Sequence, residues 1–304
     1  MKKEESSPQK FRSLSEAHRA LGLPNPKHPL ISLVSPDTQI KTDMRQAHVL
    51  NFYKISYKLQ LGGKLKYGQG YYDFDEGGLM FAAPGQIIGG NDINAGLCSS
   101  YALLIHPDFF LNYPLAKKIH EYGFFSYSTN ETLHLSEDEK TTIISVFKMI
   151  EGELNSRIDD FSQNVVIAQI ELLLNYANRF YKRQFISRKA INSDLLRKLE
   201  DVLNEYFNSE HSLSQGIPTV GYLADRLNMS PSYLSDMLRA LTGQNAQQHI
   251  HDKLIEKAKE ILSTTSLSVG EVAYALGFEH SQSFSRFFKS KTQLSPLEFR
   301  QSFN

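Results

Sequence analysis

The sequence predicts an α+β protein: an N-terminal β-barrel with two packed helices, then an all-α domain in which a linker helix joins two helix-turn-helix units. Three observations lead to this prediction. Apolar and polar residues alternate over residues 53–61, and turns with glycine or proline recur roughly every ten residues around them. Two segments after residue 136 repeat apolar residues at intervals of three and four. Near the C-terminus, a glycine turn separates two more such stripes. The 304 residues are enough for two domains.

Short strands are expected between residues 31 and 105. Residues 53–61 predict a half-buried antiparallel strand, because every second residue is apolar. Gly62-Gly63 predicts a hairpin turn into a return strand that begins at Leu65. Further strands are predicted at 79–82, 87–88 and 97–105. Short strands with this spacing are typical of a small barrel or a jelly roll.

The predicted barrel offers little for metal binding or catalysis. His48 is the one histidine between Val34 and Tyr101, so neither a metal nor another cofactor is expected. Paired carboxylates and nucleophile motifs are not found either, so we do not expect an enzyme. An apolar cavity for a small molecule is one use of such a barrel. Candidate lining residues are Tyr53, Tyr57, Tyr67 and Tyr71, which would equally pack a strand core.

Two amphipathic helices are predicted after the barrel. The first, residues 137–155, begins at a capping box formed by Ser136 and Glu139. The second, residues 161–183, repeats apolar residues at intervals of three and four. Packed antiparallel, they would each bury one stripe. Whether they form a dimer interface or only cover the barrel stays open.

Two helix-turn-helix units are predicted in the C-terminal part. In the first, a helix at 220–227 is followed by a turn, and Ser230 caps a second helix with Pro231 at its first position. In the second, an apolar stripe ends at Gly277, where a left-handed cap is expected, and another helix follows. The later helix of such a unit is free to enter a DNA major groove. The outward residues expected there are Ser232, Tyr233, Ser235, Asp236 and Arg239 in the first unit, and Ser281, Gln282, Ser285, Arg286, Lys289 and Lys291 in the second.

A single helix is expected to join the two units over residues 245–264. At a rise of ~1.5 Å per residue it would be a rod of ~30 Å. One turn of DNA separates successive major-groove faces by ~34 Å. The linker helix therefore has the length needed to place two recognition helices in consecutive grooves on one side of a duplex.

The C-terminal residues also resemble a known family, the AraC/XylS family of bacterial transcription regulators. The resemblance rests on a run of fixed spacing: Ala273, Gly277-Phe278, Phe284, Arg286, Phe288-Lys289 and Ser295-Pro296-x-x-Phe299-Arg300. One departure is Gln293, where family members usually carry a glycine that caps the recognition helix. A glutamine tolerates the left-handed backbone at some cost, so the departure concerns this cap alone.

The resemblance implies an organisation for the whole chain. Residues 1–25 are expected to be a flexible segment, 26–185 a cupin-like domain for effector binding or dimerisation, 186–192 a linker, and 193–304 the DNA-binding domain. Double-stranded DNA is the expected partner, with a small-molecule effector, a second copy of the chain and RNA polymerase as further candidates. A barrel that binds no ligand and acts only in oligomerisation is the alternative. A barrel enzyme tethered to the helical domain is a remote one.

Charge gives the two units different expected roles. The chain has 33 basic and 33 acidic residues, but from Arg286 onward four basic residues face one acidic residue. Arg286 is the candidate for a bidentate guanine contact, with Ser281 and Gln282 near base edges. Lys289 and Lys291 are expected at phosphates, as is Arg239 in the first unit. Asp236 would repel phosphates, so fewer base contacts are expected from that unit.

The remaining features bear on the compartment. A single cysteine, Cys98, excludes an internal disulfide framework. No stretch approaches the ~18 uninterrupted apolar residues of a membrane span. The charged N-terminus has no apolar run behind it, so it is not a secretory signal. These features lead us to expect a cytoplasmic protein without a membrane partner.

Overall fold

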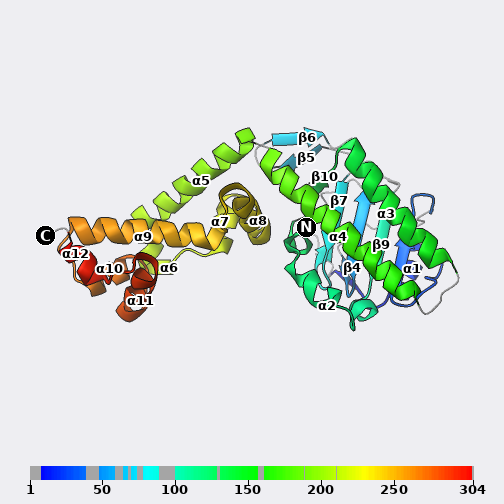
Figure 1. The fold of residues 1–304 in the computed structure, drawn as a ribbon, viewed down its shortest axis with the longest axis horizontal. Coiled ribbons are helices and arrows are strands. Elements are labelled where there is room, and N and C mark those ends of the chain that lie inside the picture. Colours follow the sequence, from blue (N-terminus) through cyan, green and yellow to red (C-terminus); the bar gives the residue numbers. More distant parts are fainter. Residues whose placement is uncertain are drawn as a thin grey trace, which may run out of the picture. The chain divides into compact units, whose positions relative to one another are not determined.

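The computed structural model describes residues 8–38, 48–58, 64–67, 70–73, 78–88, 100–128, 131–156, 161–187, 189–209 and 211–302. The chain divides into two compact units, Met1–Gln184 and Phe185–Asn304. All described strands belong to the first unit, and the described elements of the second are helices (Figure 1). The predicted α+β class is therefore confirmed. No helix within the described ranges is both long and apolar enough to cross a membrane.

The strands of the first unit form three sheets. The main sheet has the order β10-β7-β4-β9-β2, and every neighbouring pair is antiparallel. Its strands are β2 (Ile31–Val34), β4 (Tyr53–Lys58), β7 (Gly78–Ala82), β9 (Ser100–Ile105) and β10 (Leu133–His134). A second sheet combines β1 (Gln9–Phe11), β3 (His48–Leu50) and β8 (Ile87–Ile88), and a third β5 (Lys64–Tyr67) with β6 (Gly70–Asp73). The described strands thus do not close into the predicted barrel. The predicted hairpin at Gly62-Gly63 lies outside the described residues.

The main sheet is covered on both faces. On one, Tyr53 packs against the rings of Phe110 and Phe125, and Tyr101 stacks on Phe147 with ring centroids 5.2 Å apart. On the other, Leu104 joins a cluster of buried residues built from Phe11, Leu14, Ala17, Leu50 and Phe52. That cluster includes α1 (Leu14–Leu21), which is capped by Ser13. The expected flexible N-terminal segment is therefore ordered from residue 8 onward, because its apolar residues are needed to cover this face.

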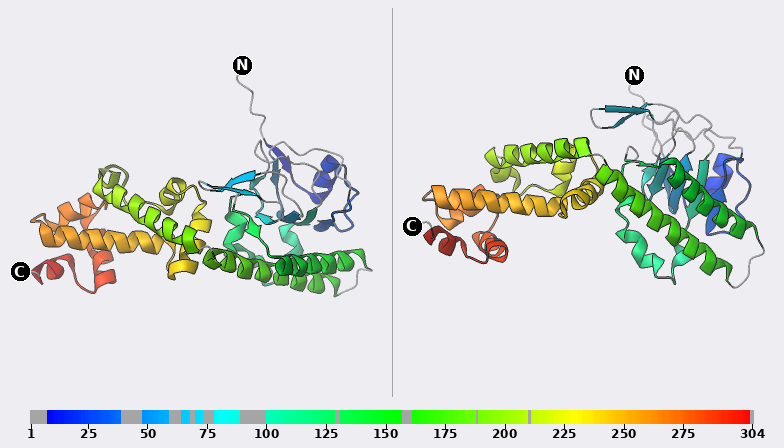
Figure 2. Two further views of the ribbon diagram at one scale, coloured as in Figure 1. Left: turned by 90° about the horizontal axis from the view of Figure 1, so that it is seen from above. Right: turned by 45° about the horizontal axis from the view of Figure 1, so that its top comes forward.

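Short helical turns connect β9 to β10. They are η1 (Pro107–Phe110), α2 (Leu115–Lys118), η2 (Ile119–Glu121) and η3 (Gly123–Ser126). Beyond β10, helices α3 (Glu137–Asn155) and α4 (Ser162–Ser187) lie side by side (Figures 1 and 2). The predicted capping box of Ser136 and Glu139 is present. Arg183 near the end of α4 donates to the Glu139 carboxylate at the start of α3, at 3.0 and 2.6 Å. The two helices are therefore antiparallel, as predicted.

The second unit contains eight helices among its described residues. They are α5 (Lys189–Asn208), α6 (His211–Gln215), α7 (Val220–Arg226), α8 (Pro231–Thr242), α9 (Ala246–Thr264), α10 (Val269–Ala275), α11 (Ser281–Thr292) and α12 (Pro296–Gln301). The predicted cap of α8 is confirmed, because the Ser230 hydroxyl accepts from the Tyr233 amide; the helix ends at Gly243, which is left-handed. The expected linker at 186–192 is helical at its described positions, since α4 extends to Ser187 and α5 begins at Lys189.

Helix α9 is shared by two small apolar cores. Its first turns contribute Ala246 and Ile250 to a core completed by α5, α7 and α8. Its later turns contribute residues to a second core with α10 and α11, where Phe284 and Phe288 are fully buried. Phe207 and Ile217 pack against both cores. The two halves are therefore built on one rigid helix, which at ~1.5 Å per residue is roughly 28 Å long.

A contact between two glycine backbones also ties the halves together. Gly277, after α10, and Gly216, after α6, both have positive φ angles, of 87° and 79°. A Cβ added to Gly277 would lie 2.5 Å from the carbonyl carbon of Gly216. The Ser212 hydroxyl donates to the Ala275 carbonyl at 2.9 Å in the same place. Glycine is therefore required at position 277 both by its backbone angle and by the close approach of another backbone.

Replacing Gly277 with alanine should destabilise the second unit by about 2–5 kcal/mol, because the cost of a left-handed alanine is added to a backbone clash. Gly243 provides the matched control: its φ angle is 80°, but nothing lies within 4 Å of an added Cβ. Gly243→Ala should cost only about 1–2 kcal/mol. Native-state hydrogen exchange of the α9 amides measures both changes. Equal losses of protection in the two variants would contradict the role of the glycine contact.

Candidate nucleic-acid interface

Helix α11 presents a polar face opposite its buried side. Phe284 and Phe288 are buried, whereas Gln282, Arg286 and Lys289 are exposed. At ~100° per residue, these three positions lie within ~60° of one another on the side away from the core. Ser281 and Ser285 are half-buried at its margin. The structure thus brings three of the six predicted residues of the second helix-turn-helix unit onto one surface, which we call the α11 face: Gln282, Ser283, Arg286, Lys289 and Ser290.

Two residues of the α11 face were not predicted, and three predicted residues lie outside it: Ser281 and Ser285 at its margin, and Lys291. Ser283 and Ser290 are exposed beside Arg286, and a helical projection around the buried phenylalanines would have identified both. Lys291 is exposed but lies ~140° around the helix from Arg286. Its charge, after the larger effect of burial, helps to lower the pKa of His251 on α9. Lys291 therefore faces α9.

The cations of α11 have no ion pairs within the described part of the chain, unlike most cations around them. Arg226 pairs with Glu205 at 2.8 Å, and on α9 Lys253 and Lys257 pair with Glu256 and Glu260 at 3.0 and 2.9 Å. The two lysines of α9 are also largely covered, with side-chain exposures of 10% and 15%. The positive charge available to an anion is therefore concentrated on α11.

The first helix-turn-helix unit, α7 with α8, differs from the prediction at Tyr233. This residue was expected on the outward face of α8, but it is 1% exposed and contacts the ring of Phe185 with centroids 5.1 Å apart. Removing an aromatic ring from water and packing it against another ring is favourable, so Tyr233 is turned inward. Ser232 and Ser235 are half-buried, and Arg239 is exposed. Tyr233 is therefore a core residue of this unit.

Asp236 and Arg239 on α8 form an ion pair. The Arg239 guanidinium donates to the Asp236 carboxylate at 2.8 Å, one helical turn away. Side-chain exposures of 56% and 30% mark it as a surface pair, which contributes little to stability. Its effect is electrostatic, because the charges cancel on the part of α8 that was expected to meet phosphates. The surface of α8 is therefore close to neutral, whereas that of α11 is positive.

The residues after α11 have structural roles. Gln293 occupies the left-handed cap with a φ angle of 64°, and its amide donates to the Lys289 carbonyl at 2.9 Å. Pro296 is the buried first residue of α12. The Arg300 Nε donates to the Leu262 carbonyl at the end of α9, at 3.1 Å. These contacts hold α11 against α9.

Tyr53, Tyr57, Tyr67 and Tyr71, the tyrosines predicted to line a ligand cavity, lie on strands of two different sheets. Tyr53 and Tyr57 are 5% and 1% exposed and pack in the core of the main sheet, where burial raises the pKa of both hydroxyls. Tyr67 and Tyr71 belong to β5 and β6, in the separate two-stranded sheet. The cavity observed in this unit, of about 550 Å³, lies elsewhere, at the edge strand β2. Among the described residues, no group of three or more His, Cys, Asp or Glu is arranged to hold a metal ion.

Comparisons with known proteins identify a helix-turn-helix region in the C-terminal part of the chain. The family described as a helix-turn-helix domain matches residues 223–302. The arabinose operon regulatory protein of Escherichia coli (strain K12) is 33% identical over 114 residues, which cover 37% of this chain and 39% of the regulator. The regulator YijO of the same organism is 33% identical over 122 residues, 40% of this chain and 42% of YijO. The chain thus spans less than half of these relatives.

A solved structure gives a similar match. The C-terminal domain of the response regulator yesN from Fusobacterium nucleatum is 32% identical, with a TM-score of 0.30; the match covers 34% of this chain and 93% of that domain. The helix-turn-helix match at 223–302 and the similarity to the arabinose operon regulatory proteins support an AraC-type helix-turn-helix domain in this chain.

Proposed function

We propose that the protein is a sequence-specific, double-stranded DNA-binding transcription regulator in which α11 is the leading recognition helix. The observation that supports this most directly is the set of three exposed cations on α11 without ion pairs, beside neighbouring cations that are neutralised by carboxylates. Unpaired Lys and Arg side chains release counterions from DNA when they meet phosphates. A helix that presents them after a short glycine turn suits the major groove.

The residues of the α11 face divide into base and phosphate contacts. Arg286 lies opposite the buried phenylalanines and has the fork of donors that matches guanine O6 and N7. Gln282, in the first turn, is suited to adenine. Lys289 is suited to a phosphate near the end of α11, and Lys291 to one on the side toward α9. Ser281 and Ser285 are marginal because they are half-buried.

Two helix-turn-helix units, α7 with α8 and α10 with α11, are part of the proposal. Helix α9 has 19 residues and joins them as a rod of roughly 28 Å. That length is close to the ~34 Å between successive major-groove faces. The first helix-turn-helix unit contributes less to DNA binding, because Asp236 forms an ion pair with Arg239 and because Tyr233 is buried. Ser232 and Ser235 remain its candidate contacts.

The N-terminal unit, Met1–Gln184, is proposed to regulate the DNA-binding domain or to pair two copies of the chain. The protein is proposed to act in the cytoplasm, with RNA polymerase as a further partner. Helix α4 and its preceding residue expose Phe161, Val165 and Leu172, which are 71%, 39% and 40% exposed and share one helical side. An apolar stripe of this kind suits a second copy of the chain. A small molecule in this unit would modulate DNA binding; the alternative is a ligand-free unit that acts only in oligomerisation.

The main proposal is tested by selecting DNA sequences with the purified protein. A random duplex library should yield an enriched motif with recognisable half-sites, because base contacts from α11 distinguish one sequence from another. Failure to enrich any motif, with the protein folded by circular dichroism, would overturn the proposal.

Replacing Arg286 with alanine should cost about 1–3 kcal/mol of binding to the selected site and relax the preference at one base pair. The matched control is Lys289→Ala, one turn along the same face. It should weaken binding to all sequences alike and reduce the salt slope by about 1. Fluorescence anisotropy with single-base variants of the site separates the two effects. An unchanged base preference in Arg286→Ala would show that another residue reads that base.

Replacing Asp236 with asparagine should strengthen non-specific DNA binding, because it releases Arg239 for a phosphate. The slope of log affinity against log salt should steepen by about 0.9. Asp201→Asn serves as the control: it makes the same charge change on α5, where Asp201 pairs with Arg197 at 3.8 Å. If both variants steepen the slope equally, the change reflects net charge rather than the position of Arg239.

Replacing Leu172 with glutamate should disrupt a dimer formed through α4, because it places a charge within the exposed apolar stripe. Asn178→Glu adds the same charge to α4 at an exposed position ~120° away from Leu172. Sedimentation equilibrium should report a monomer for the first variant and an unchanged dimer for the second. A dimer of normal strength in Leu172→Glu would exclude this face as the interface.

A further inference from the structure

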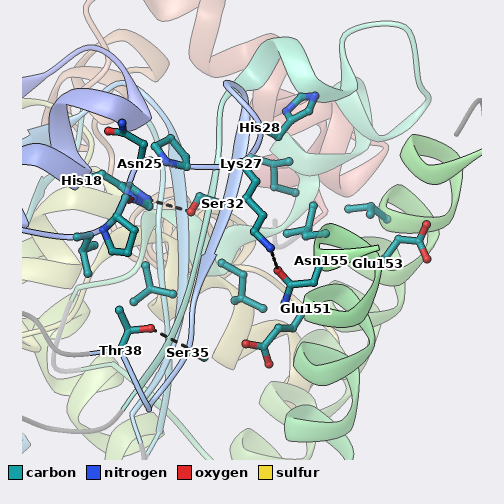
Figure 3. Close-up of a pocket in the computed structure, with 18 of the residues that line it drawn as sticks. His18, Asn25, Lys27, His28, Ser32, Ser35, Thr38, Glu151, Glu153 and Asn155 are labelled. Carbon is teal, nitrogen blue, oxygen red and sulfur yellow. Dashed lines mark hydrogen bonds between the residues drawn. The ribbon is translucent and has the colours of Figure 1, made fainter. Parts of the chain in front are cut away.

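The cavity of the first unit lies between the edge strand β2 and the neighbouring ends of α3 and α4 (Figure 3). Its volume is about 550 Å³. All of its described walls belong to the same compact unit. Much of the wall is apolar, and this part combines strand and helix residues: Ile31, Leu33, Val34, Phe109, Leu154 and Val166. A concave, largely apolar site of this size is typical of those that bind small molecules.

One end of the cavity is negatively charged. The Glu151 carboxylate points from α3 into the part of the cavity where Ser35 and Thr38 lie (Figure 3). The hydroxyls of these two residues are 3.4 Å apart. Asp37 adds a second carboxylate nearby: after the larger effect of burial, Glu151 and Asp37 both raise the pKa of Tyr101. Among the described residues, no Lys, Arg or His nitrogen forms an ion pair with Glu151.

Several other polar groups of the cavity have hydrogen-bond partners. His18 lies 2.5 Å from the Pro24 carbonyl through Nδ1 and 2.9 Å from the Ser32 hydroxyl through Nε2. Burial lowers the pKa of His28, whose Nδ1 accepts from the Leu30 amide at 3.1 Å. One helical turn along α3 from Glu151, the Lys27 ammonium donates to the Asn155 side-chain oxygen at 2.7 Å (Figure 3). Glu151 therefore has no ion-pair partner among the described residues, and the neighbouring cation Lys27 is bonded to the neutral amide of Asn155.

We propose that this cavity binds a small organic ammonium compound with an apolar body. Its ammonium group, with three N–H donors, would pair with the Glu151 carboxylate and reach the hydroxyls of Ser35 and Thr38. Its apolar part would lie against β2, α3 and α4, where area removed from water adds affinity. A neutral or anionic compound of the same shape would leave the carboxylate without a partner, which is unfavourable in a partly dry site.

The position of the cavity suggests that a bound compound would regulate pairing of the chain with a second copy, and this inference rests on the proposed function. The last turns of α3 and the first turn of α4 supply part of the wall. Phe161 and Val165 of the exposed stripe lie in the same region of the chain, next to the wall residues Ser162 and Val166. An occupant would therefore hold together two helix ends beside the surface proposed to pair with a second copy.

The test measures ligand binding by the full chain without DNA, so that it is independent of the regulator assignment. Butylamine, hexylamine and phenethylamine are compared with the alcohols of the same carbon skeleton by thermal shift and calorimetry. At least one amine should bind saturably and about tenfold or more tightly than its alcohol, as expected for a charge-assisted hydrogen bond. No saturable binding by any amine, or equal binding by amine and alcohol, would overturn the proposal.

Two variants separate the site from general charge effects. Glu151→Gln should weaken amine binding about tenfold or more and leave alcohol binding unchanged. Glu153→Gln removes the same charge two residues along α3, from a carboxylate that points away from the cavity (Figure 3), and should bind the amine as the natural protein does. Equal losses in both variants would overturn the assignment of Glu151. DNA selection with the same preparation reports separately on the proposed function.

Discussion

The sharing of α9 by two cores is the constraint on which the proposed DNA-binding surface depends. Neither core has enough buried residues of its own to be a separate domain, since each combines short helices with one part of α9. On α9, the two cores meet between Ile250 and Leu254, which are one helical turn apart. The Gly216–Gly277 contact adds a second connection, between the residues that follow α6 and α10. The relative placement of α8 and α11 is therefore set by packing within the unit and not by a flexible connection.

Electrostatics then distinguishes the two halves. Most cations near α8 and α9 are neutralised by carboxylates three or four residues away or on an adjacent helix. Among the described residues the cations of α11 form no ion pair, and the one acidic residue after Arg286, Glu298, caps α12; its pKa is lowered mainly by hydrogen bonds from Ser295 and to a smaller extent by the charge of Lys289. A chain with no net charge thus keeps one small positive surface. That surface follows from the positions of acidic residues as much as from those of basic ones.

Local signals in the sequence predicted the second unit well. Ser230, Gly243 and Gly277 act through the backbone of a single turn, so their roles follow from neighbouring residues alone. The apolar stripes of α9 and α11 likewise reveal which side is buried. What could not be predicted depends on distant partners. Tyr233 is buried by Phe185, 48 positions earlier, and helix α6 has only five residues and no periodicity. In the first unit, the pairing of strands into separate sheets depends on long-range contacts that alternation does not specify.

The Asp236–Arg239 pair has a consequence for the order of events at a DNA site. Long-range attraction acts first on the α11 end of the second unit, because the α8 end has nearly no net field. We therefore expect α11 to make the encounter contact and α8 to dock afterwards, once Arg239 exchanges its carboxylate for a phosphate. In kinetic terms, salt would slow association mainly through α11, whereas the lifetime of the complex would depend on how readily this intramolecular pair opens.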